Sequence, residues 1–599
     1  MNTDYLDMRA HFYPRESEGR ARFRLDELAA VWKCSSKQAK RKLKKLDENG
    51  SCSYIPGRGR GNCSEIRFRS LFQDDLDAAI RHSLLAKNMD LLMHILQLPC
   101  PKQWSSQLLR PIHEPLGVQA PDPITDVLQA IVTLPVTNLD PAQASVTYDL
   151  MLVSLIGDKL LRYDAKQDRL LPHLAAAWET DVDCRTWTVY LRKQVRFHHR
   201  RPLTSGDVKF SLERLMCPDC ANRWLAEDIG TVDCMNPLTV RIVLKRPNPL
   251  FGRFLAAAPT AIVAEDAPVH GKHFIGTGPY MLTECNRLKA VLEAFDDYFG
   301  LRPYIDTVQF WHVRADAAHQ IGYRLAGTGA QSEAMRTGEE GKEMEHAAVE
   351  ERVEQGFRFL LFNTRHAGLM QDRALRHAIH ELCDVEAMWR DLGRSGLIPA
   401  SHFIPGKSKP FARSLRQARQ WLAESSYQGE DVHLSLLDLP AAWEEGHWLK
   451  RRAARIGLNL VLHPYALDDL YDSSGSAGER MDLILSGYVS THDPLLSMMG
   501  AFHNPVLPFR KWMADEHIHP IIGILEQMKQ AAPLAGEAFG DNIIRYLHDN
   551  MLLVFLYHPR HQHRFDLMLR HIQFDPFAFP DVTALWVRPA WTAEGKRQL

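Results

Sequence analysis

Residues 187–198 read WTVYLRKQVRFH, and residues 202–212 read PLTSGDVKFSL. In the first stretch, polar and apolar side chains alternate over residues 188–192, which is typical of a strand with one buried face. In the second stretch, hydroxyl side chains precede an apolar helical face that begins at Val208. The two stretches therefore predict a strand and a capped helix in close succession.

A second informative stretch is the pentapeptide GTGPY at residues 276–280. Two glycines and a proline predict a tight turn before a strand that starts at Tyr280, because glycine permits backbone conformations that other residues avoid. No Gly-Lys pair follows, so the pentapeptide is not a phosphate-binding loop.

The composition is that of a globular protein. Of the 599 residues, 45% are hydrophobic and 24% are charged, which excludes a fibrous or disordered chain and allows roughly three or four domains. No apolar run approaches the roughly 18 residues that span a bilayer. The first ten residues, MNTDYLDMRA, lack the features of a secretory leader, and the ten cysteines show no repeated spacing. We therefore expect a cytoplasmic protein with reduced thiols and no membrane segment.

Positive charge is concentrated near the N-terminus. Residues 1–70 hold 16 Lys and Arg against 9 Asp and Glu, whereas the whole chain carries a net charge of -1. A basic head on a mildly acidic body favours local binding of nucleic acid.

This basic head carries a helix-turn-helix pattern. Apolar residues repeat with helical spacing over 25–32, and Ser35 or Ser36 can cap a second helix that stops at Asn49-Gly50. The outer face of the second helix is cationic, so its Lys and Arg side chains are expected to neutralise phosphates while others reach base edges. A lysine-rich helix can also be a solvated surface, but few of these lysines have an acidic partner four residues away. The DNA contacts predicted on this helix are Ser36, Lys37, Gln38, Lys40, Arg41 and Lys44.

A basic hairpin is predicted to follow the second helix. Residues 52–55 and 64–68 alternate as strands, and the connecting PGRGRG of residues 56–61 is flexible. Its arginines, Arg58 and Arg60, complete the predicted DNA contacts. A hairpin of this kind is typical of the wing of a winged helix.

Residues 71–120 are predicted to join the head to the rest of the chain. Apolar residues with helical spacing from Leu76 to Ile95 indicate a connecting helix, which is a candidate dimer contact. Prolines then recur from Pro99 to Pro121 and indicate an extended linker.

The larger part of the chain resembles a known family, the family 5 solute-binding proteins, which are the oligopeptide and dipeptide binders of ABC importers. The segments that carry the resemblance occur in the family's order at residues 137–141, 174–179, 187–198, 202–212, 276–280, 361–364 with 373–379, and 481–487. Together with the winged-helix pattern at the N-terminus, the chain resembles the SgrR-type transcriptional regulators.

The resemblance implies an α/β fold with a two-lobed, periplasmic-binding-protein-like (type II) body behind a winged helix-turn-helix domain. The two lobes would close around a ligand by a hinge motion. The ligand implied by the regulator family is a small intracellular metabolite of the sugar or sugar phosphate type. The predicted domains are a winged helix-turn-helix domain over 1–70, a connecting helix and linker over 71–120, lobe one over 121–355 completed by 556–599, and lobe two over 356–555.

One loop departs from the peptide-binding members. In those proteins the strand that resembles residues 481–487 leads to an aromatic residue and then to an Asp that pairs with the ligand's ammonium group. Here Tyr488 matches the aromatic residue, Thr491 falls near the Asp position, and Asp493 is expected to be structural. An ammonium group desolvated without a carboxylate is costly, so ordinary peptides are disfavoured. The candidate ligand-binding residues are Thr137, Asn138, Tyr488, Thr491 and His492, although Tyr488 fits a core position equally well.

We expect no metal, cofactor or catalytic centre. Cys217-Pro-Asp-Cys220 lacks the second pair that zinc requires, and the histidines near residue 560 are interpreted as packing. The motifs H-E-x-x-H and G-x-S-x-G and the P-loop are absent from the sequence. The favoured hypothesis is a non-enzymatic regulator that binds double-stranded DNA and a small molecule, with a homodimer left open. The alternative is a substrate-binding receptor of an ABC importer, and a hydrolase on this scaffold ranks third.

Overall fold

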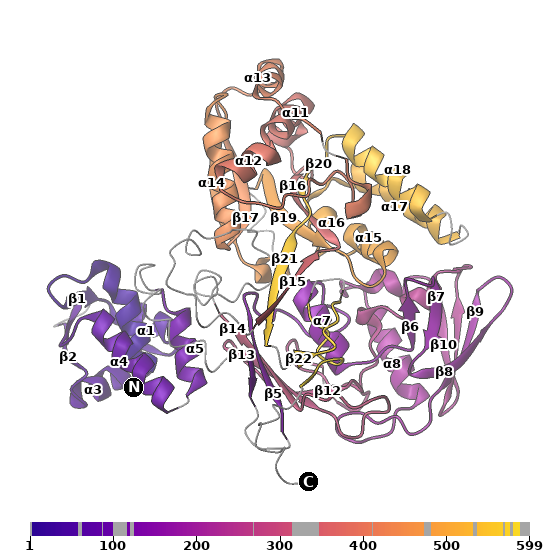
Figure 1. The fold of residues 1–599 in the computed structure, drawn as a ribbon, viewed down its shortest axis with the longest axis horizontal. Coiled ribbons are helices and arrows are strands. Elements are labelled where there is room, and N and C mark those ends of the chain that lie inside the picture. Colours follow the sequence, from indigo (N-terminus) through magenta and orange to yellow (C-terminus); the bar gives the residue numbers. More distant parts are fainter. Residues whose placement is uncertain are drawn as a thin grey trace, which may run out of the picture.

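The structure is a computed structural model in which a small N-terminal head stands beside a larger two-lobed body (Figure 1). It describes residues 3–57, 63–86, 88–99, 117–119, 125–267, 269–313, 347–409, 411–471, 481–530, 536–566, 569–575 and 579–587. The boundaries between the domains stay predictions.

The head is a winged helix-turn-helix with additional helices. Its elements are α1 (Thr3–Phe12), β1 (Arg20–Phe23), α2 (Leu25–Val31), α3 (Ser36–Glu48), β2 (Cys52–Ile55), β3 (Ser64–Phe68), α4 (Phe72–Leu85) and α5 (Met89–Gln97). The sheet has the order β1-β3-β2 and is antiparallel. The strands β2 and β3 coincide with the predicted hairpin, whereas α1 and β1 were not predicted.

A buried arginine ties α1 to the rest of the head. Arg9 is fully buried, and its guanidinium carbon lies 4.0 Å from the centre of the Phe68 ring. Its nitrogens lie 3.5 Å from Asp75 and 3.6 Å from Glu16, and Tyr5 donates a hydrogen bond of 2.8 Å to Asp75. Since Asp75 belongs to α4, this network places α1, the wing and α4 in one unit.

Two helices occupy the stretch where one connecting helix was predicted. The chain breaks between α4 and α5, where the Asn88 side chain accepts a hydrogen bond of 3.0 Å from the backbone of Leu91 and so caps α5. Both helices contribute to the same hydrophobic core as α1, α2 and α3. Most of the predicted linker lies outside the described residues.

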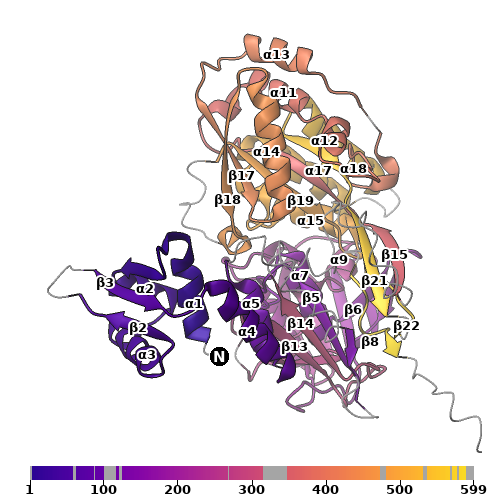
Figure 2. The same ribbon diagram turned by 60° about the vertical axis from the view of Figure 1, so that its left-hand side comes forward.

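Helix α5 also docks the head on the body. Ile131 and Trp311 of the body belong to the core of the head, and the Gln97 side chain donates a hydrogen bond of 2.9 Å to the carbonyl of His312. Asp90 and Lys289 form an ion pair of 3.1 Å across the same boundary. Figure 2 shows α4 and α5 beside β13 and β14 of the body.

Lobe one contains two larger sheets. The first has the order β12-β13-β14-β5-β4, and the second has the order β10-β11-β9-β8. Its elements are β4 (Gly117–Gln119), β5 (Val127–Val132), α7 (Thr147–Ile156), β6 (Leu161–Asp164), β7 (Arg169–Pro172), β8 (Ala175–Thr180), β9 (Thr186–Leu191), α8 (Ser205–Leu215), β10 (Ile229–Asn236), β11 (Thr239–Leu244), α9 (Phe251–Phe254), β12 (Tyr280–Cys285), β13 (Lys289–Ala294) and β14 (Thr307–His312). The predicted strand and capped helix are β9 and α8.

Two long strands cross from lobe one to lobe two, β15 (Ala347–Val353) and β21 (Arg560–Asp566), and they pair antiparallel to each other. Lobe two is built on a sheet of order β18-β17-β19-β16-β20. Its elements are β16 (Gly356–Phe362), α11 (Arg373–Leu382), α12 (Val385–Asp391), α13 (Leu415–Glu424), β17 (Asp431–Leu437), α14 (Pro440–Ala454), β18 (Asn459–Tyr465), β19 (Leu483–Val489), α15 (Pro494–His503), α16 (Pro508–Trp512), α17 (Asp515–Gln530), α18 (Gly536–Asp549) and β20 (Leu553–Tyr557). After β21 the chain returns to lobe one, where β22 (Leu569–Arg570) pairs with β23 (Trp586–Val587) and Leu569 and Val582 join the core. None of the helices in the described ranges is both long and apolar enough to cross a membrane.

The GTGPY pentapeptide fits tightly under α7. A Cβ atom on Gly276 would lie 2.1 Å from the carbonyl oxygen of Ile156, and one on Gly278 would lie 2.5 Å from that of Leu155. Thr277 between them donates a hydrogen bond of 3.1 Å to the buried Asp158. The glycines are therefore required by close approach of two backbones and not, as the sequence suggested, by an unusual turn conformation.

Replacing Gly276 by Ala should destabilise lobe one by about 2–3 kcal/mol, because a backbone carbonyl cannot move aside as a side chain can. Thermal or urea unfolding of the full chain measures this. Gly406→Ala is the matched control, since no atom lies within 4 Å of its added Cβ. Equal unfolding transitions for the two variants would contradict this account of the pentapeptide.

Candidate functional site

The second helix of the helix-turn-helix presents a cationic surface. Ser35 and Gln38 form a capping box at the start of α3, and the buried stripe of Ala39, Leu43 and Leu46 faces the core. The opposite face exposes Lys37, Lys40, Arg41, Lys44 and Lys45. Within the described part of the chain, none of these five forms an ion pair, so their charges remain available to an anion.

Two predicted DNA contacts already have partners inside the head. The Ser36 hydroxyl donates a hydrogen bond of 2.7 Å to Asp26 of α2 and so fixes the angle between the two helices. The side-chain oxygen of Gln38 accepts a hydrogen bond of 3.1 Å from the backbone of Ser35. Both residues thus have a structural role, and their contact with bases stays a prediction. Arg58 and Arg60 at the tip of the predicted wing lie outside the described residues.

The opening loop of lobe one is organised by a buried carboxylate. Asp149 of α7 accepts hydrogen bonds from the backbone of Thr137 at 3.0 Å and of Asn138 at 2.9 Å, and from the Thr137 hydroxyl. Burial raises the pKa of Asp149 to about 6 in spite of these bonds. The Asn138 side chain accepts a hydrogen bond of 3.0 Å from the backbone of Asp140. The side chains of Thr137 and Asn138 therefore shape this loop, and ligand contact by either one stays a prediction.

The corresponding loop of lobe two follows β19. Tyr488 is half-buried, with its ring centre 5.0 Å from that of Phe403 and 5.3 Å from that of Phe357. The Thr491 hydroxyl lies 2.7 Å from that of Ser497 in the first turn of α15. Tyr488 thus packs against an aromatic cluster and Thr491 closes a turn, while their ligand contacts stay predictions.

His492 is the member of this loop that faces solvent. Although part of its surface is exposed, the protein atoms packed around the ring lower its pKa. The charges of Lys159 and Arg162 of lobe one act in the same direction, while that of Asp581 opposes them. Lys159 is half-buried, and burial lowers its pKa as well. No described carboxylate forms an ion pair with Lys159. Two cations and one carboxylate therefore act electrostatically on His492 where the two lobes face each other. Sequence reasoning missed Lys159 and Arg162 because a lone basic residue has no sequence signature.

An ion pair joins the two lobes beside this loop. Arg253 of lobe one donates hydrogen bonds of 2.6 and 2.5 Å to the two oxygens of Asp493. The same carboxylate caps α15 by accepting from the backbones of Leu495 and Leu496 at 3.1 Å each. Every oxygen of Asp493 is thus occupied, as expected for a structural acid, so this loop offers no free carboxylate to an ammonium group.

Further contacts between the lobes surround this pair. Asn504 of α15 donates hydrogen bonds of 2.9 Å to Ser145 and 3.0 Å to Asn222. The rings of Trp224 and His503 stack with their centres 5.6 Å apart. One hydrophobic cluster runs through both lobes on this side. The lobes are therefore in direct contact in this structure.

The motifs that the sequence led us to discount have structural partners. The Cys220 thiol donates a hydrogen bond to the carbonyl of Arg214, and burial raises its pKa to about 11, so it is a poor nucleophile at neutral pH. His558 and His561 bind Gly356 and Glu354 beside the crossing strands. The side chain of His563 lies outside the described residues. Within the described part of the chain, no group of three or more His, Cys, Asp or Glu side chains is placed to hold a metal ion.

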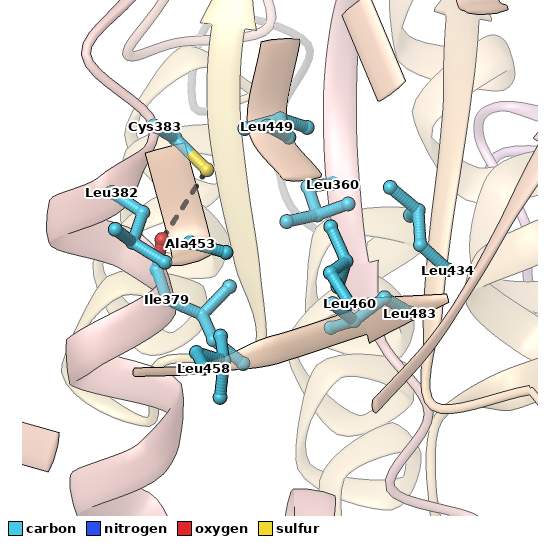
Figure 3. Close-up of a pocket in the computed structure, with 10 residues that line it drawn as sticks. All are labelled: Leu360, Ile379, Leu382, Cys383, Leu434, Leu449, Ala453, Leu458, Leu460 and Leu483. Atoms are coloured by element: carbon cyan, nitrogen blue, oxygen red, sulfur yellow. Dashed lines mark hydrogen bonds between the residues drawn. The ribbon is translucent and has the colours of Figure 1, made fainter. Parts of the chain in front are cut away.

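A small void in lobe two is unrelated to this site. Figure 3 shows it between α11, α14 and the sheet, lined by apolar side chains such as Ile379, Leu434 and Leu460. Its volume of about 10 Å³ is at the lower limit for one water molecule, and its walls offer no polar partner. It is a packing defect and has no room for a metabolite.

Replacing Arg253 by Met removes the guanidinium that pairs with Asp493. Because the side chains of Arg253 and Asp493 are only 12% and 8% exposed, water cannot fully compensate the carboxylate that is left. We expect a loss of about 3 kcal/mol in unfolding free energy and a larger radius of gyration in X-ray scattering as the lobes separate. Lys209→Met, which removes an exposed pair with Glu213 within α8, is the control. Identical melting and scattering of the two variants would show that the pair does not hold the lobes together.

Comparison with known proteins agrees with this architecture. Residues 169–505 match the bacterial extracellular solute-binding proteins, family 5, and residues 1–116 match the N-terminal region of the sugar transport-related sRNA regulators. The HTH-type transcriptional regulator SgrR of Yersinia enterocolitica is 25% identical over 509 residues, which are 83% of this chain and 84% of that protein. SgrR of Pectobacterium atrosepticum is 28% identical over 355 residues, 59% of this chain and 60% of that protein. The uncharacterized protein YhjP of Bacillus subtilis is 27% identical over 448 residues, 73% of this chain and 74% of that protein.

Solved structures confirm the predicted fold of the body. The oligopeptide-binding protein AppA of Bacillus subtilis, in complex with a nonapeptide, has a TM-score of 0.66 at 17% identity and covers 77% of this chain and 99% of its own. NikZ of Campylobacter jejuni, in complex with Ni(L-His), has a TM-score of 0.63 at 18% identity with the same coverage. The chain therefore belongs to the family 5 solute-binding proteins and, because an SgrR-type N-terminal region precedes that domain, to the SgrR-type regulators.

Proposed function

We propose that the protein is a cytoplasmic transcription regulator that binds double-stranded DNA through its head and senses a small metabolite through its body. The observation that carries the proposal is the unpaired cationic face of α3, on a winged helix-turn-helix that is docked on a solute-binding fold. Ligand binding between the lobes would shift the population of arrangements of the opening loop of lobe one, and the head docked on lobe one would report that shift to DNA. The alternative, an importer receptor, gives no reason for such a head.

The ligand proposed here is a polar anion of the sugar phosphate type. Lys159 is half-buried without an ion-pair partner among the described residues. The charge of Asp158 offsets its desolvation only in part, because the pKa of Lys159 is still lowered, so a further anion would stabilise it. Arg162 adds a second positive charge, and Asp493 is already occupied by Arg253. These features support an anionic group at this place more than the ammonium group of a peptide.

The DNA proposal predicts a specific salt dependence. In a gel-shift titration with the gene's own upstream region, the variant Lys40→Ala/Arg41→Ala/Lys44→Ala should bind more weakly, and the slope of log K against log salt should fall by about 3, because about 0.9 counterions are released per phosphate contact. The control is Lys166→Ala/Arg169→Ala/Lys193→Ala, which removes three exposed cations from lobe one. Absence of specific binding by the wild type at moderate salt, with and without metabolites, would reject the proposed function.

The ligand proposal predicts selective thermal stabilisation. Among hexose phosphates, the parent hexoses, inorganic phosphate and short peptides, a hexose phosphate should raise the melting temperature most. At a hundred times its Kd it should add about 2.7 kcal/mol. Lys159→Met should abolish the difference between hexose phosphate and hexose, whereas the exposed Lys193→Met should retain it. Stabilisation by peptides alone would favour the importer receptor.

A further inference from the structure

One face of α4 exposes apolar side chains that the head does not use. Leu71, directly before the helix, is 71% exposed, and Leu85 at its end is 88% exposed. Ala78 lies midway between them and is also exposed. The opposite face of α4, with Phe72, Leu76, Ala79 and Ile80, is buried in the core of the head.

The spacing of the exposed apolar residues places them on one side of the helix, in a stripe that charged residues interrupt. Leu71, Ala78 and Leu85 are seven residues apart, which returns to nearly the same side of a helix after two turns. Exposing most of two leucine side chains on one side of a helix is unfavourable in proportion to the apolar area that they present to water. Their neighbours on this face are charged, with exposed Asp74 near the start and exposed Arg81 and His82 near the end.

This stripe complements itself. A two-fold axis through Ala78 places Leu71 of one copy opposite Leu85 of the other, because the two positions are equally far from residue 78. The same operation places Asp74 opposite His82, with Arg81 one residue closer to the axis. The small side chain of Ala78 at the centre lets the two helices approach closely. Apolar contacts and opposite charges are thus satisfied together, as an isologous interface requires.

We propose that the exposed face of α4 binds the same face of a second copy of this chain, antiparallel, and that this contact pairs two heads on DNA. The proposal rests on the proposed function, because pairing two heads has a role in DNA binding only if each head binds one half-site of the operator. A second copy fits the surface better than an unrelated partner does, because the order of charges along the stripe is complementary only under two-fold symmetry.

The contact is small, so it is weak in free solution. A single pair of four-turn helices offers less than the roughly 800 Å² per partner of a standard interface. DNA with two half-sites holds two heads near each other and raises their effective concentration. The dimer contact is therefore expected to be populated mainly on DNA. This agrees with the exposure of the same helix face in the single chain.

Cross-linking of the full-length protein tests the geometry. Ala78→Cys places thiols of two copies against each other at the axis, so a short bismaleimide should produce a covalent dimer several times more abundant than in wild type, with a further increase on DNA. Gln167→Cys is the control, because residue 167 is exposed in the turn between β6 and β7 of lobe one, outside the head. The exposed native thiols Cys63, Cys217 and Cys234 give the same background in both variants. A dimer band no stronger than that of the control, with and without DNA, overturns the proposal.

A charge exchange tests the pairing without relying on a cysteine. Asp74→Arg and Arg81→Asp each turn two attractions across the axis into repulsions, so each should weaken sedimentation-detected association about tenfold. The double variant Asp74→Arg/Arg81→Asp restores opposite charges and should recover association, which a merely destabilised helix would not do. Failure of the double variant to recover, or equal association of all variants, overturns the α4 interface. Loss of DNA binding with cross-linking intact instead rejects the proposed function and leaves the interface standing.

Discussion

The ion pair between Arg253 and Asp493 is the interaction on which the arrangement of the body depends. Asp493 caps α15 and at the same time receives two hydrogen bonds from lobe one, so one carboxylate sets both the loop after β19 and the distance between the lobes. Both side chains are nearly buried, and each would be an uncompensated charge without the other. The loop that carries His492, just after Tyr488 near the end of β19, is therefore held against lobe one, where Lys159 and Arg162 add positive charge.

The head is attached to lobe one through an interface that combines apolar and polar contacts. Ile131 and Trp311 extend its apolar core into lobe one, while Gln97 and the pair Asp90–Lys289 fix the direction of α5. Apolar burial supplies most of the attraction, and the polar contacts select one orientation. The head is thus attached by packing to lobe one, beyond its covalent connection.

Sequence patterns predicted the elements that have one buried face. Burial alternates at the start of β3, and α3 has a clear apolar stripe, so their bounds were predicted closely. α1 was missed because Tyr5, Leu6, Met8 and Arg9 are buried on several sides, which leaves no stripe to recognise. In the cleft, family likeness pointed to Thr137 and Thr491, whose hydroxyls close their own loops. Lys159 was missed because its surroundings come from both lobes and exist only in the folded chain.

The two boundaries are connected by one strand. β5 contributes Ile131 to the core beneath α5, and six residues later the chain reaches Thr137, which is held by Asp149 in the opening loop of lobe one. Its neighbour β14, paired in parallel register, carries His312 and Trp311 at the same docking surface. Since the head is docked on lobe one, movement of lobe two alone leaves the contacts between the head and lobe one unchanged. Under the proposed function, a ligand that preferred one arrangement of the opening loop would act on β5, and its differential binding energy would be available at the docking surface of the head.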